Sequence, residues 1–581
     1  MMSSRIRTPG KNLAKLKLSS PTCQPKPQVA GCLVQIWNSI FSRQGILGVE
    51  SEHFSTVFAL LGVLEASSQT YQSYRASNLL PRSELNSMMV TLLITNCWTT
   101  AGIGLFLRKS PALERVLALT SDAMISFVMM TIVPLVIFIP YVEAFNIKGK
   151  VFYNPDFLYN PVSLVSMVLG NRLIFAASMF DFITKVIPQL SIMLSLFTVS
   201  ELLGRDDLKV VPRADSQSLQ SMTVKPKASS SNSGKTAEQN KTLTVNPQNS
   251  SQRKSLDALL RRGHSIATVV FVLWGAIVLI LHSLAAKRAA NYEVLGCRAV
   301  TRPWFSNGKE PCASLYYDCH AQNTMSPDQK SFDKLDHVVL ATLTIAHCPQ
   351  LQMPPDLQKL QNLVALHIYN STIVNWDTSS SISATAHLRL LSVLVGRTQM
   401  SEFPQGILQP LPASMIGVQF SHTNLKMVPN DLYLRWHSLV VIAFENSELT
   451  YIPYQMFFSP VYLLSFSGNQ IETIPTLAMM PPGMIIGELR LTSNPLKELP
   501  AALMQPTSFI MSLNVQNTSL TDMPAWVKTN TKLVWAYDTP FCMTPMADPT
   551  LAYKVMCFAN PRGQKAYFPM YMLDSLYAYN E

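Results

Sequence analysis

Proline recurs at a nearly fixed interval in the second half of this 581-residue chain, at positions 404, 429, 453, 475, 500 and 524. Segments aligned on these prolines, such as VYLLSFSGNQIETIP (461–475) and IGELRLTSNPLKELP (486–500), share apolar residues at positions 1, 4, 6, 11 and 14. Asn or a small polar residue occupies position 9. A repeat of 20 to 50 residues indicates a solenoid, in which each unit buries its apolar face against its neighbours.

The repeated pattern resembles the leucine-rich-repeat superfamily. It covers residues 340–524 in about eight units, of which the earliest are the least regular. The resemblance implies an α/β leucine-rich-repeat solenoid with a curved parallel sheet, in which positions 4 and 6 face the core and the position-9 side chain caps buried backbone.

Positions 2, 3, 5, 7 and 8 of each unit would lie on the exposed concave face, which in this superfamily usually binds another protein. We therefore expect a protein or glycan ligand there, although most residues of any such face are merely solvated. The candidate binding residues are Gln419, His422, Glu445, Asn446, Glu488, Arg490, Asn514 and Gln516.

Cysteines flank the repeats. Residues 290–339 form the expected N-terminal cap and hold Cys297, Cys312 and Cys319, whereas residues 525–581 form the C-terminal cap and tail and hold Cys542 and Cys557. Such caps resemble those of extracellular members of the superfamily, which implies a disulfide between Cys542 and Cys557. The three N-terminal cysteines cannot all pair among themselves, and Cys348, at position 9 of the first repeat, is expected to be a buried core thiol. The sequons at Asn370 and Asn517 are candidate N-glycosylation sites.

Long apolar runs dominate the first half and predict a multi-pass α-helical membrane domain. The strongest, Ile266 to Ala286, has no charged residue over a length that crosses a hydrocarbon core of about 30 Å. Asp181 and Lys185 lie one helical turn apart and form a candidate intramembrane ion pair. The first run is the weakest, because Glu65 and a polar stretch follow it, and it is also compatible with an interfacial helix. The expected spans are residues 54–74, 86–107, 118–142, 173–203 and 266–286.

Charge follows the membrane topology. Residues 1–289 hold 29 basic and 15 acidic side chains, whereas residues 290–581 hold 17 and 20. In a five-span arrangement, the basic segment 1–53 (net +5), the short loop 108–117 (+2) and the loop 204–265 (+6) all lie on one side. Because cytoplasmic loops carry the excess of Lys and Arg, we expect a cytoplasmic N terminus and an extracellular or lumenal repeat domain, in the plasma membrane or an endomembrane. The loop, rich in Ser, Thr, Asn and Lys, is expected to be disordered.

The chain shows no phosphate-binding loop, no zinc motif and no nucleophile motif, so we expect neither an enzyme nor a cofactor. The excess of positive charge is topological, so nucleic acid is not expected as a partner. The favoured interpretation is a receptor-like multi-pass protein whose partners are the lipid bilayer and a protein ligand. The alternative is an ion-channel subunit that resembles volume-regulated anion channels, which have four spans and cytoplasmic C-terminal repeats.

Overall fold

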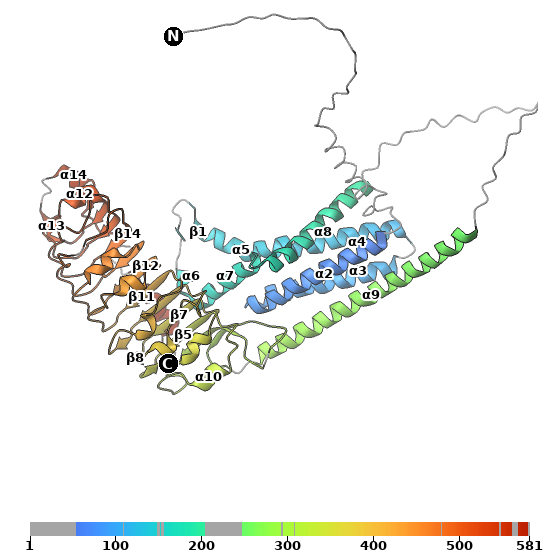
Figure 1. The fold of residues 1–581 in the computed structure, drawn as a ribbon, viewed down its shortest axis with the longest axis horizontal. Helices are drawn as coiled ribbons and strands as arrows, with labels where there is room; N and C mark the ends of the chain where they lie inside the picture. The colour runs from blue at the N-terminus through green and yellow to red at the C-terminus, as the bar shows by residue number, and fades with distance from the viewer. Residues whose placement is uncertain are drawn as a thin grey trace, which may run out of the picture.

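The computed structural model describes residues 54–107, 110–147, 151–152, 156–203, 247–291, 294–306, 308–477, 479–544, 548–560 and 567–578. These residues form an elongated helical bundle and a curved solenoid that meets one end of it (Figure 1). The expected basic segment 1–53 and most of the expected disordered loop, 204–246, lie outside the described residues.

The bundle contains five long helical segments. Helix α2 is followed by α3, by a continuous run of α4, the π-helix η1 and α5, and then by α8 and α9. A short hairpin (β1 and β2) and the helices α6 and α7 lie between α5 and α8. The bounds are α2 (Phe54–Leu79), α3 (Ser83–Phe106), α4 (Pro111–Phe127), η1 (Val128–Ile132), α5 (Val133–Glu143), β1 (Phe145–Asn146), β2 (Val151–Phe152), α6 (Asp156–Tyr159), α7 (Pro161–Ile174), α8 (Met179–Leu203) and α9 (Pro247–Ala290).

Local chemistry explains several of these boundaries. The Asn160 side chain caps α7 by accepting from the backbone N–H groups of Val162 (3.0 Å) and Ser163 (3.3 Å), and Pro161 takes the first helical position, where its missing N–H costs nothing. The wider turn of η1 directly precedes Pro134, which cannot donate a helical hydrogen bond. Pro134 therefore lies just after a π-helical turn within one continuous helical segment.

Two expected boundaries are wrong. The span expected over 173–203 includes the end of α7 and a turn at 175–178, because the apolar residues on either side belong to different helices. Residues 247–265, expected within the disordered loop, form the first half of α9, which runs unbroken for 44 residues.

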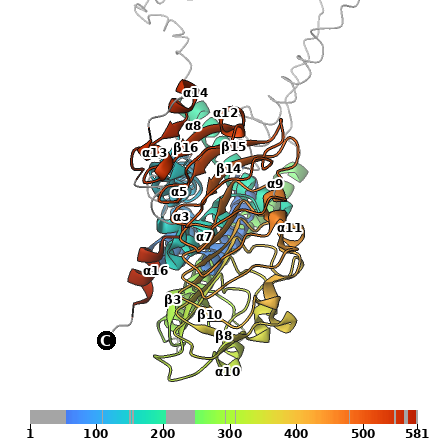
Figure 2. The ribbon, with the colours of Figure 1, turned by 90° about the vertical axis from the view of Figure 1, so that its left-hand side faces the viewer.

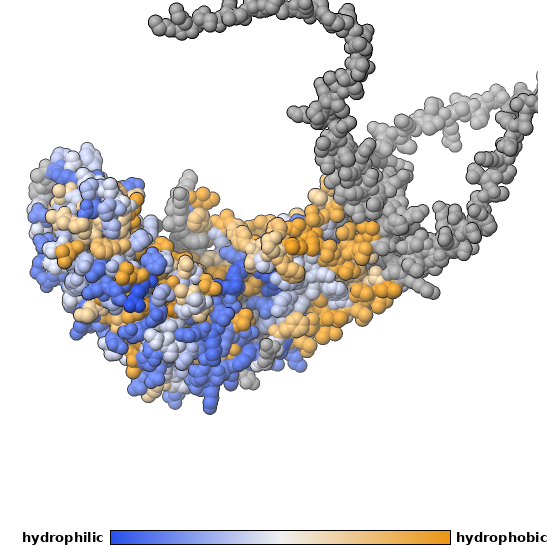
Figure 3. All heavy atoms as spheres, viewed as in Figure 1, coloured by the Kyte–Doolittle hydropathy of each residue, from blue (hydrophilic) through white to orange (hydrophobic). Residues whose placement is uncertain are grey.

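The bundle has apolar side chains on its outer surface and both apolar and polar ones inside. Four of its helical segments are long and apolar enough to cross a membrane: Ser83–Phe106, Leu113–Glu143, Met179–Ser200 and Ser265–Ala290. Their exposed faces carry residues such as Phe127, Phe182 and Ile277, and the orange surface of the bundle contrasts with the blue repeat domain in Figure 3. Beside buried apolar residues such as Leu93 and Met129, the described interior holds the polar residues Glu65, Gln69, Gln72, Ser73, Asn86, Asn96, Asp122, Ser126 and Asp181.

Helix α2 supplies much of that polar interior and contacts α3, α7, α8 and α9. Helix α2 is less apolar than the other four segments, because its second half carries a polar stretch. The polar side chains of Ser68, Gln69, Gln72 and Ser73 in this stretch are buried inside the bundle. The Gln69 amide donates to Glu65 (3.0 Å) and to Ser126 on α4 (2.8 Å) and accepts from Asn96 on α3 (3.1 Å). Hydrogen bonds across helices therefore hold α2 among its neighbours.

The solenoid is built on one twelve-stranded sheet. Strands β4 to β17 pair in parallel in chain order, apart from the outer strands β6, β8 and β10, and β3 joins β4 as an antiparallel edge strand. The bounds are β3 (Cys297–Val300), β4 (Cys312–Asp318), β5 (Thr342–Ala346), β7 (Ala365–Tyr369), β9 (Ser392–Gly396), β11 (Gly417–Ser421), β12 (Val441–Glu445), β13 (Leu463–Ser465), β14 (Ile485–Arg490), β15 (Phe509–Asn514), β16 (Thr531–Trp535) and β17 (Val555–Met556), with outer strands β6 (Leu351–Gln352), β8 (Thr372–Asn375) and β10 (Gln399–Met400).

Short helices line the opposite side of the solenoid and its two ends. They are α10 (Gln329–Asp333), η2 (Pro355–Lys359), η3 (Thr378–Ser380), η4 (Gln405–Ile407), α11 (Leu432–Arg435), η5 (Tyr454–Phe458), α12 (Trp526–Asn530), α13 (Pro540–Met543) and α14 (Pro549–Ala552). The last helix, α16 (Met570–Tyr577), lies against the concave face. The parallel stack extends beyond the expected 340–524 on both sides, because β4 lies in the N-terminal cap and β16 and β17 lie in the C-terminal cap.

The repeat positions behave as the pattern predicts. Residues at positions 4 and 6, such as Val418 and Phe420, are fully buried in the core. The position-9 amide of Asn469 donates to the carbonyls of Phe444 (2.8 Å) and Phe466 (2.9 Å). Position 8 adds a feature not expected from the sequence, because its residue has a positive φ in successive repeats, which Asn and Gly tolerate best. These residues are His347, Asn370, Arg397, His422, Asn446, Gly468, Ser493, Asn517 and Asp538.

Three disulfides close the caps. Cys542 pairs with Cys557, as expected. Cys297 pairs with Cys312, and Cys319 pairs with Cys348. The expectation that Cys348 is a free core thiol is therefore wrong: β4 and β5 are adjacent parallel strands, so the turn after each one brings Cys319 and Cys348 together. Cys348 is the missing fourth partner of the N-terminal cap.

Candidate functional site

The C-terminal tail covers much of the concave face of the solenoid. After Asn560 the described tail resumes at Tyr567 and runs through α16, which lies beside the strand stack in Figure 2. The buried residues Phe568, Leu573 and Tyr577 pack against the concave side chains of Tyr369 and Leu394. The tail runs back along the solenoid, from β12 towards β5.

The first attachment point is Glu445, which ends β12. Its carboxylate accepts the backbone N–H groups of Tyr567 (3.0 Å) and Phe568 (2.8 Å), and it is also bonded by the Ser465 hydroxyl. Burial raises the pKa of Glu445, because the charged form loses its hydration, and these donors only partly offset the effect. Glu445 thus binds a backbone segment of this same chain.

The second attachment point is an ion pair between Arg397 and Asp574. The guanidinium donates from Nε and Nη2 to the two carboxylate oxygens, both at 2.7 Å, and the Tyr369 hydroxyl donates to Oδ1 at 2.7 Å. The hydrogen bonds from Arg397 hold the pKa of Asp574 below its usual range. Such bidentate pairing fixes orientation as well as attachment.

The third attachment point is Tyr577, which is fully buried. Its hydroxyl lies 3.0 Å from Nδ1 of His367 and 3.3 Å from the Thr344 hydroxyl, and its ring stacks on Tyr316 at a centroid distance of 5.4 Å. Its carbonyl lies 2.8 Å from Nε2 of His347. The last turn of α16 is therefore the most deeply anchored part of the tail.

Most of the expected binding residues consequently lie under other parts of the chain. Tyr159 of α6 lies against Gln419 and Tyr567, and the Gln516 side chain accepts the backbone N–H of Asn560 at 3.0 Å. The structure buries five of the eight candidates: Gln419, Glu445, Arg490, Asn514 and Gln516. The sequence pattern placed them on the concave face but contained no signal that the tail would cover it.

The other three candidates remain accessible along one edge of the face. His422 is exposed, and Asn446 and Glu488 are partly exposed. His422 and Asn446 occupy position 8, so they lie in the turns after the strands. Glu488 forms an ion pair with Arg490 at 2.7 Å. The structure thus leaves the turn residues His422 and Asn446, here called the turn ridge, and Glu488 of β14 available to a partner, and not an open concave sheet.

The two candidate glycosylation sites differ. Asn517 is exposed, whereas Asn370 is partly buried and its side-chain amide lies 2.9 Å from Nδ1 of His347, next to the end of the tail. Both have positive φ and lie at position 8. Asn517 is the more accessible acceptor for a glycan.

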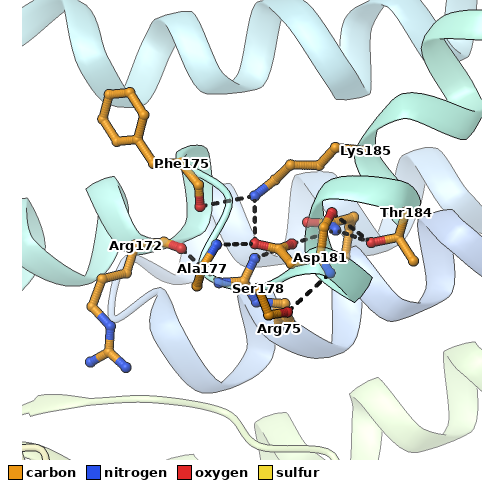
Figure 4. Close-up of polar contacts among 9 residues, drawn as sticks. Arg75, Arg172, Phe175, Ala177, Ser178, Asp181, Thr184 and Lys185 are labelled. Atoms are coloured by element: carbon orange, nitrogen blue, oxygen red, sulfur yellow. Dashed lines mark hydrogen bonds and ion pairs between the residues drawn. The ribbon is translucent and has the colours of Figure 1, made fainter.

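The candidate ion pair in the bundle is present and has a second basic partner. Lys185 Nζ lies 3.0 Å from Asp181 Oδ2, and Arg75 of α2 contacts the other carboxylate oxygen (Figure 4). The carboxylate also accepts the Ala177 backbone N–H (2.8 Å) and the Gln72 amide (2.9 Å). Asp181, on α8, therefore bonds to α2 and to the turn between α7 and α8.

The comparisons with known proteins add little to this picture. No family model matches the chain, and no curated protein matches it. Solved structures with similar folds include the Toll–Spatzle complex of Drosophila (TM-score 0.31, 16% identity), the TLR13–ssRNA13 complex (0.32, 14%) and the effector XopL (0.29, 15%). They cover 39%, 39% and 45% of this chain, which spans 34%, 32% and 90% of theirs.

This similarity is too distant to support an argument about function. The leucine-rich-repeat fold of the C-terminal half is assigned from its register, its position-9 asparagines and its period. The chain spans about a third of the length of Toll and of TLR13. The expectation that nucleic acid is not a partner of this chain stays a prediction.

Proposed function

We propose that this chain is a multi-pass membrane protein that displays a leucine-rich-repeat recognition domain on the extracellular or lumenal side. The observation that carries the proposal is the apolar outer surface of the bundle, which encloses hydrogen-bonded polar side chains among the apolar residues of its interior. In water such a surface would aggregate, whereas in lipid it is the stable arrangement.

The path of the chain supports five crossings. Arg302 of the N-terminal cap donates from its backbone N–H to the Ser77 carbonyl and from Nη1 to the Pro81 carbonyl, so α2 ends beside the repeat domain. Successive long segments then alternate in direction, and α9 returns to the repeat domain. If α2 is counted as the first crossing, its first residue, Phe54, lies at the end of the bundle that is far from the repeats. The three disulfides favour an oxidising compartment for the repeat domain.

The recognition surface follows from the tail. A partner that uses the turn ridge of His422 and Asn446, or Glu488 of β14, binds without rearrangement. A partner that uses the buried concave residues must first displace the tail. We propose that the turn ridge is the resting binding surface and that the concave face becomes available only after the tail is released.

The experiment is expression of the full chain in eukaryotic cells, followed by alkaline extraction of the membranes and glycosidase digestion. The expected result is retention in the membrane pellet and a mobility shift that Asn517→Gln removes. Release into the soluble fraction would refute the membrane assignment. Retention without any glycan would not decide sidedness, so labelling of engineered thiols from each side of the membrane complements it.

The alternative of an ion-channel subunit is favoured by one observation, the line of buried polar side chains along α2. In reconstituted vesicles a conducting path through this interior would give ion flux, which Asp181→Asn would alter. The absence of conductance would remove this alternative and leave the recognition proposal untouched.

A further inference from the structure

A pocket of about 680 Å³ lies where α9 meets the N-terminal cap. Its walls include Lys287 and Arg288 from the last turn of α9 and Lys309 and Glu310 from the loop that leads to β4. The charged side chains around it therefore carry a net charge of +2. The volume falls in the range typical of small-molecule sites, roughly 300 to 1,000 Å³.

The basic residues of this pocket are not explained by topology. Lys287 and Arg288 follow the last apolar run on the side of the repeat domain, whereas excess Lys and Arg are expected on the cytoplasmic side. Arg288 has a structural role, because its guanidinium donates to the carbonyls of Pro303 (3.2 Å) and Trp304 (2.8 Å). Lys287 and Lys309 both line the pocket and are exposed, and the Lys309 ammonium also donates to the Asp333 carbonyl.

Apolar and aromatic residues border the same place. Leu284, one turn before Arg288, is 53% exposed, and Phe305 is 64% exposed. The ring of Tyr74, at the end of α2, lies 6.3 Å from that of Trp304 and 6.0 Å from that of Phe305. Aromatic residues gather at the depth where hydrocarbon gives way to headgroups, and basic residues at that depth bind lipid phosphates.

We propose that this pocket binds the phosphate headgroup of an anionic phospholipid, with Lys287 and Lys309 contacting the phosphate and the acyl chains lying along α9 beside Leu284. The proposal rests on the membrane placement proposed above. The bound lipid would join α9 to the cap and so fix the repeat domain relative to the bundle.

The test uses the full-length protein in detergent and the midpoint of its thermal unfolding. The probes are dioctanoyl phosphatidylglycerol, dioctanoyl glycerol with the same chains but no phosphate, and inorganic phosphate. The phospholipid is expected to raise the midpoint, because a ligand that binds only the folded state stabilises it. In K287E/K309E the affinity is expected to fall at least tenfold. K426E/K532E makes the same charge change at exposed lysines of the solenoid and is expected to bind like the wild type.

Each other outcome overturns the proposal. Equal stabilisation by dioctanoyl glycerol would mean that the pocket recognises the acyl chains and not the phosphate. Equal stabilisation by inorganic phosphate would mean that it is an anion site without lipid specificity. Unchanged binding in K287E/K309E would place the lipid elsewhere. If K287E/K309E does not fold, the neutral variant K287Q/K309Q is measured in its place. Because binding is measured in detergent, failure here is distinguishable from failure of the membrane assignment, which alkaline extraction reports.

Discussion

Replacing Tyr577 by Ala should release the C-terminal tail from the concave face without unfolding the solenoid. Tyr577 is fully buried, and its ring and hydroxyl contact Tyr316, Thr344 and His367. Truncating a buried aromatic ring to Ala costs about 3–5 kcal/mol. Because these contacts lie between the tail and the repeats, most of this loss should fall on tail docking and not on the core.

A loss of about 4 kcal/mol shifts the equilibrium between docked and released tail by roughly a thousandfold. Hydrogen exchange measured by mass spectrometry on the full-length protein reports this shift at the backbone N–H groups of Tyr567 and Phe568, which are bonded to Glu445. Exchange there should accelerate, while the strands of the solenoid remain protected.

The matched control is Tyr571→Ala on the same helix, because Tyr571 is 63% exposed. It should change tail exchange little, since substitutions at exposed sites usually stay within about 0.5 kcal/mol. Unchanged tail protection in Tyr577→Ala would refute the view that this residue anchors the tail. Loss of protection throughout the solenoid would show that the tail is an integral part of the fold and cannot be released alone.

Three further predictions concern pH, the cap disulfide and the bundle interior. Burial lowers the pKa of His367 to about 4, so the unfolded chain takes up a proton before the folded one does. The contribution of His367 to the unfolding free energy is therefore complete above its ordinary pKa and declines by about 3 kcal/mol as the pH falls to 4. Thermal unfolding should show this decline in the wild type and not in His367→Gln. Removing the bond between Cys319 and Cys348, which closes 29 residues, should lower the unfolding free energy by about 3–4 kcal/mol in denaturant titrations; no change would mean that the bond is not formed in the native protein. Gln69→Leu should cost about 1–3 kcal/mol in detergent by leaving Glu65 and Asn96 without a shared partner, and a stabilising effect would contradict the hydrogen-bonded interior.

The repeat domain was predictable because its information is local and periodic. Each unit repeats the same apolar positions and the same position-9 side chain, so Val418 and Phe420 could be assigned to the core from spacing alone. The positive φ at position 8 was not inferred, although Asn at 370, 446 and 517 and Gly at 468 are residues that favour it.

The features that the sequence did not reveal depend on contacts between distant segments. The covered concave face requires the tail to return past Glu445 and Arg397, and nothing in its composition specifies where it docks. The pairing of Cys319 with Cys348 depends on adjacent strands. The repeat position correctly placed Cys348 in the core but gave no sign of its disulfide partner. The polar second half of α2 made the first run compatible with an interfacial helix. Its burial depends on hydrogen bonds with Asn96 and Ser126, which lie on other helices and could not be inferred from the sequence.

The central claim is that the N-terminal segment and the repeat domain lie on opposite sides of a membrane, and thiol labelling tests it most directly. Native Cys23 reports the N-terminal side, and Lys532→Cys introduces an exposed thiol on the repeats. An impermeant maleimide is applied to intact cells, to cells whose plasma membrane is opened with digitonin, and to fully solubilised cells. Cys23 should first be labelled at the digitonin step, whereas Lys532→Cys should be labelled either in intact cells or only after full solubilisation. First labelling of both thiols at the digitonin step would place the repeats in the cytoplasm and contradict the account.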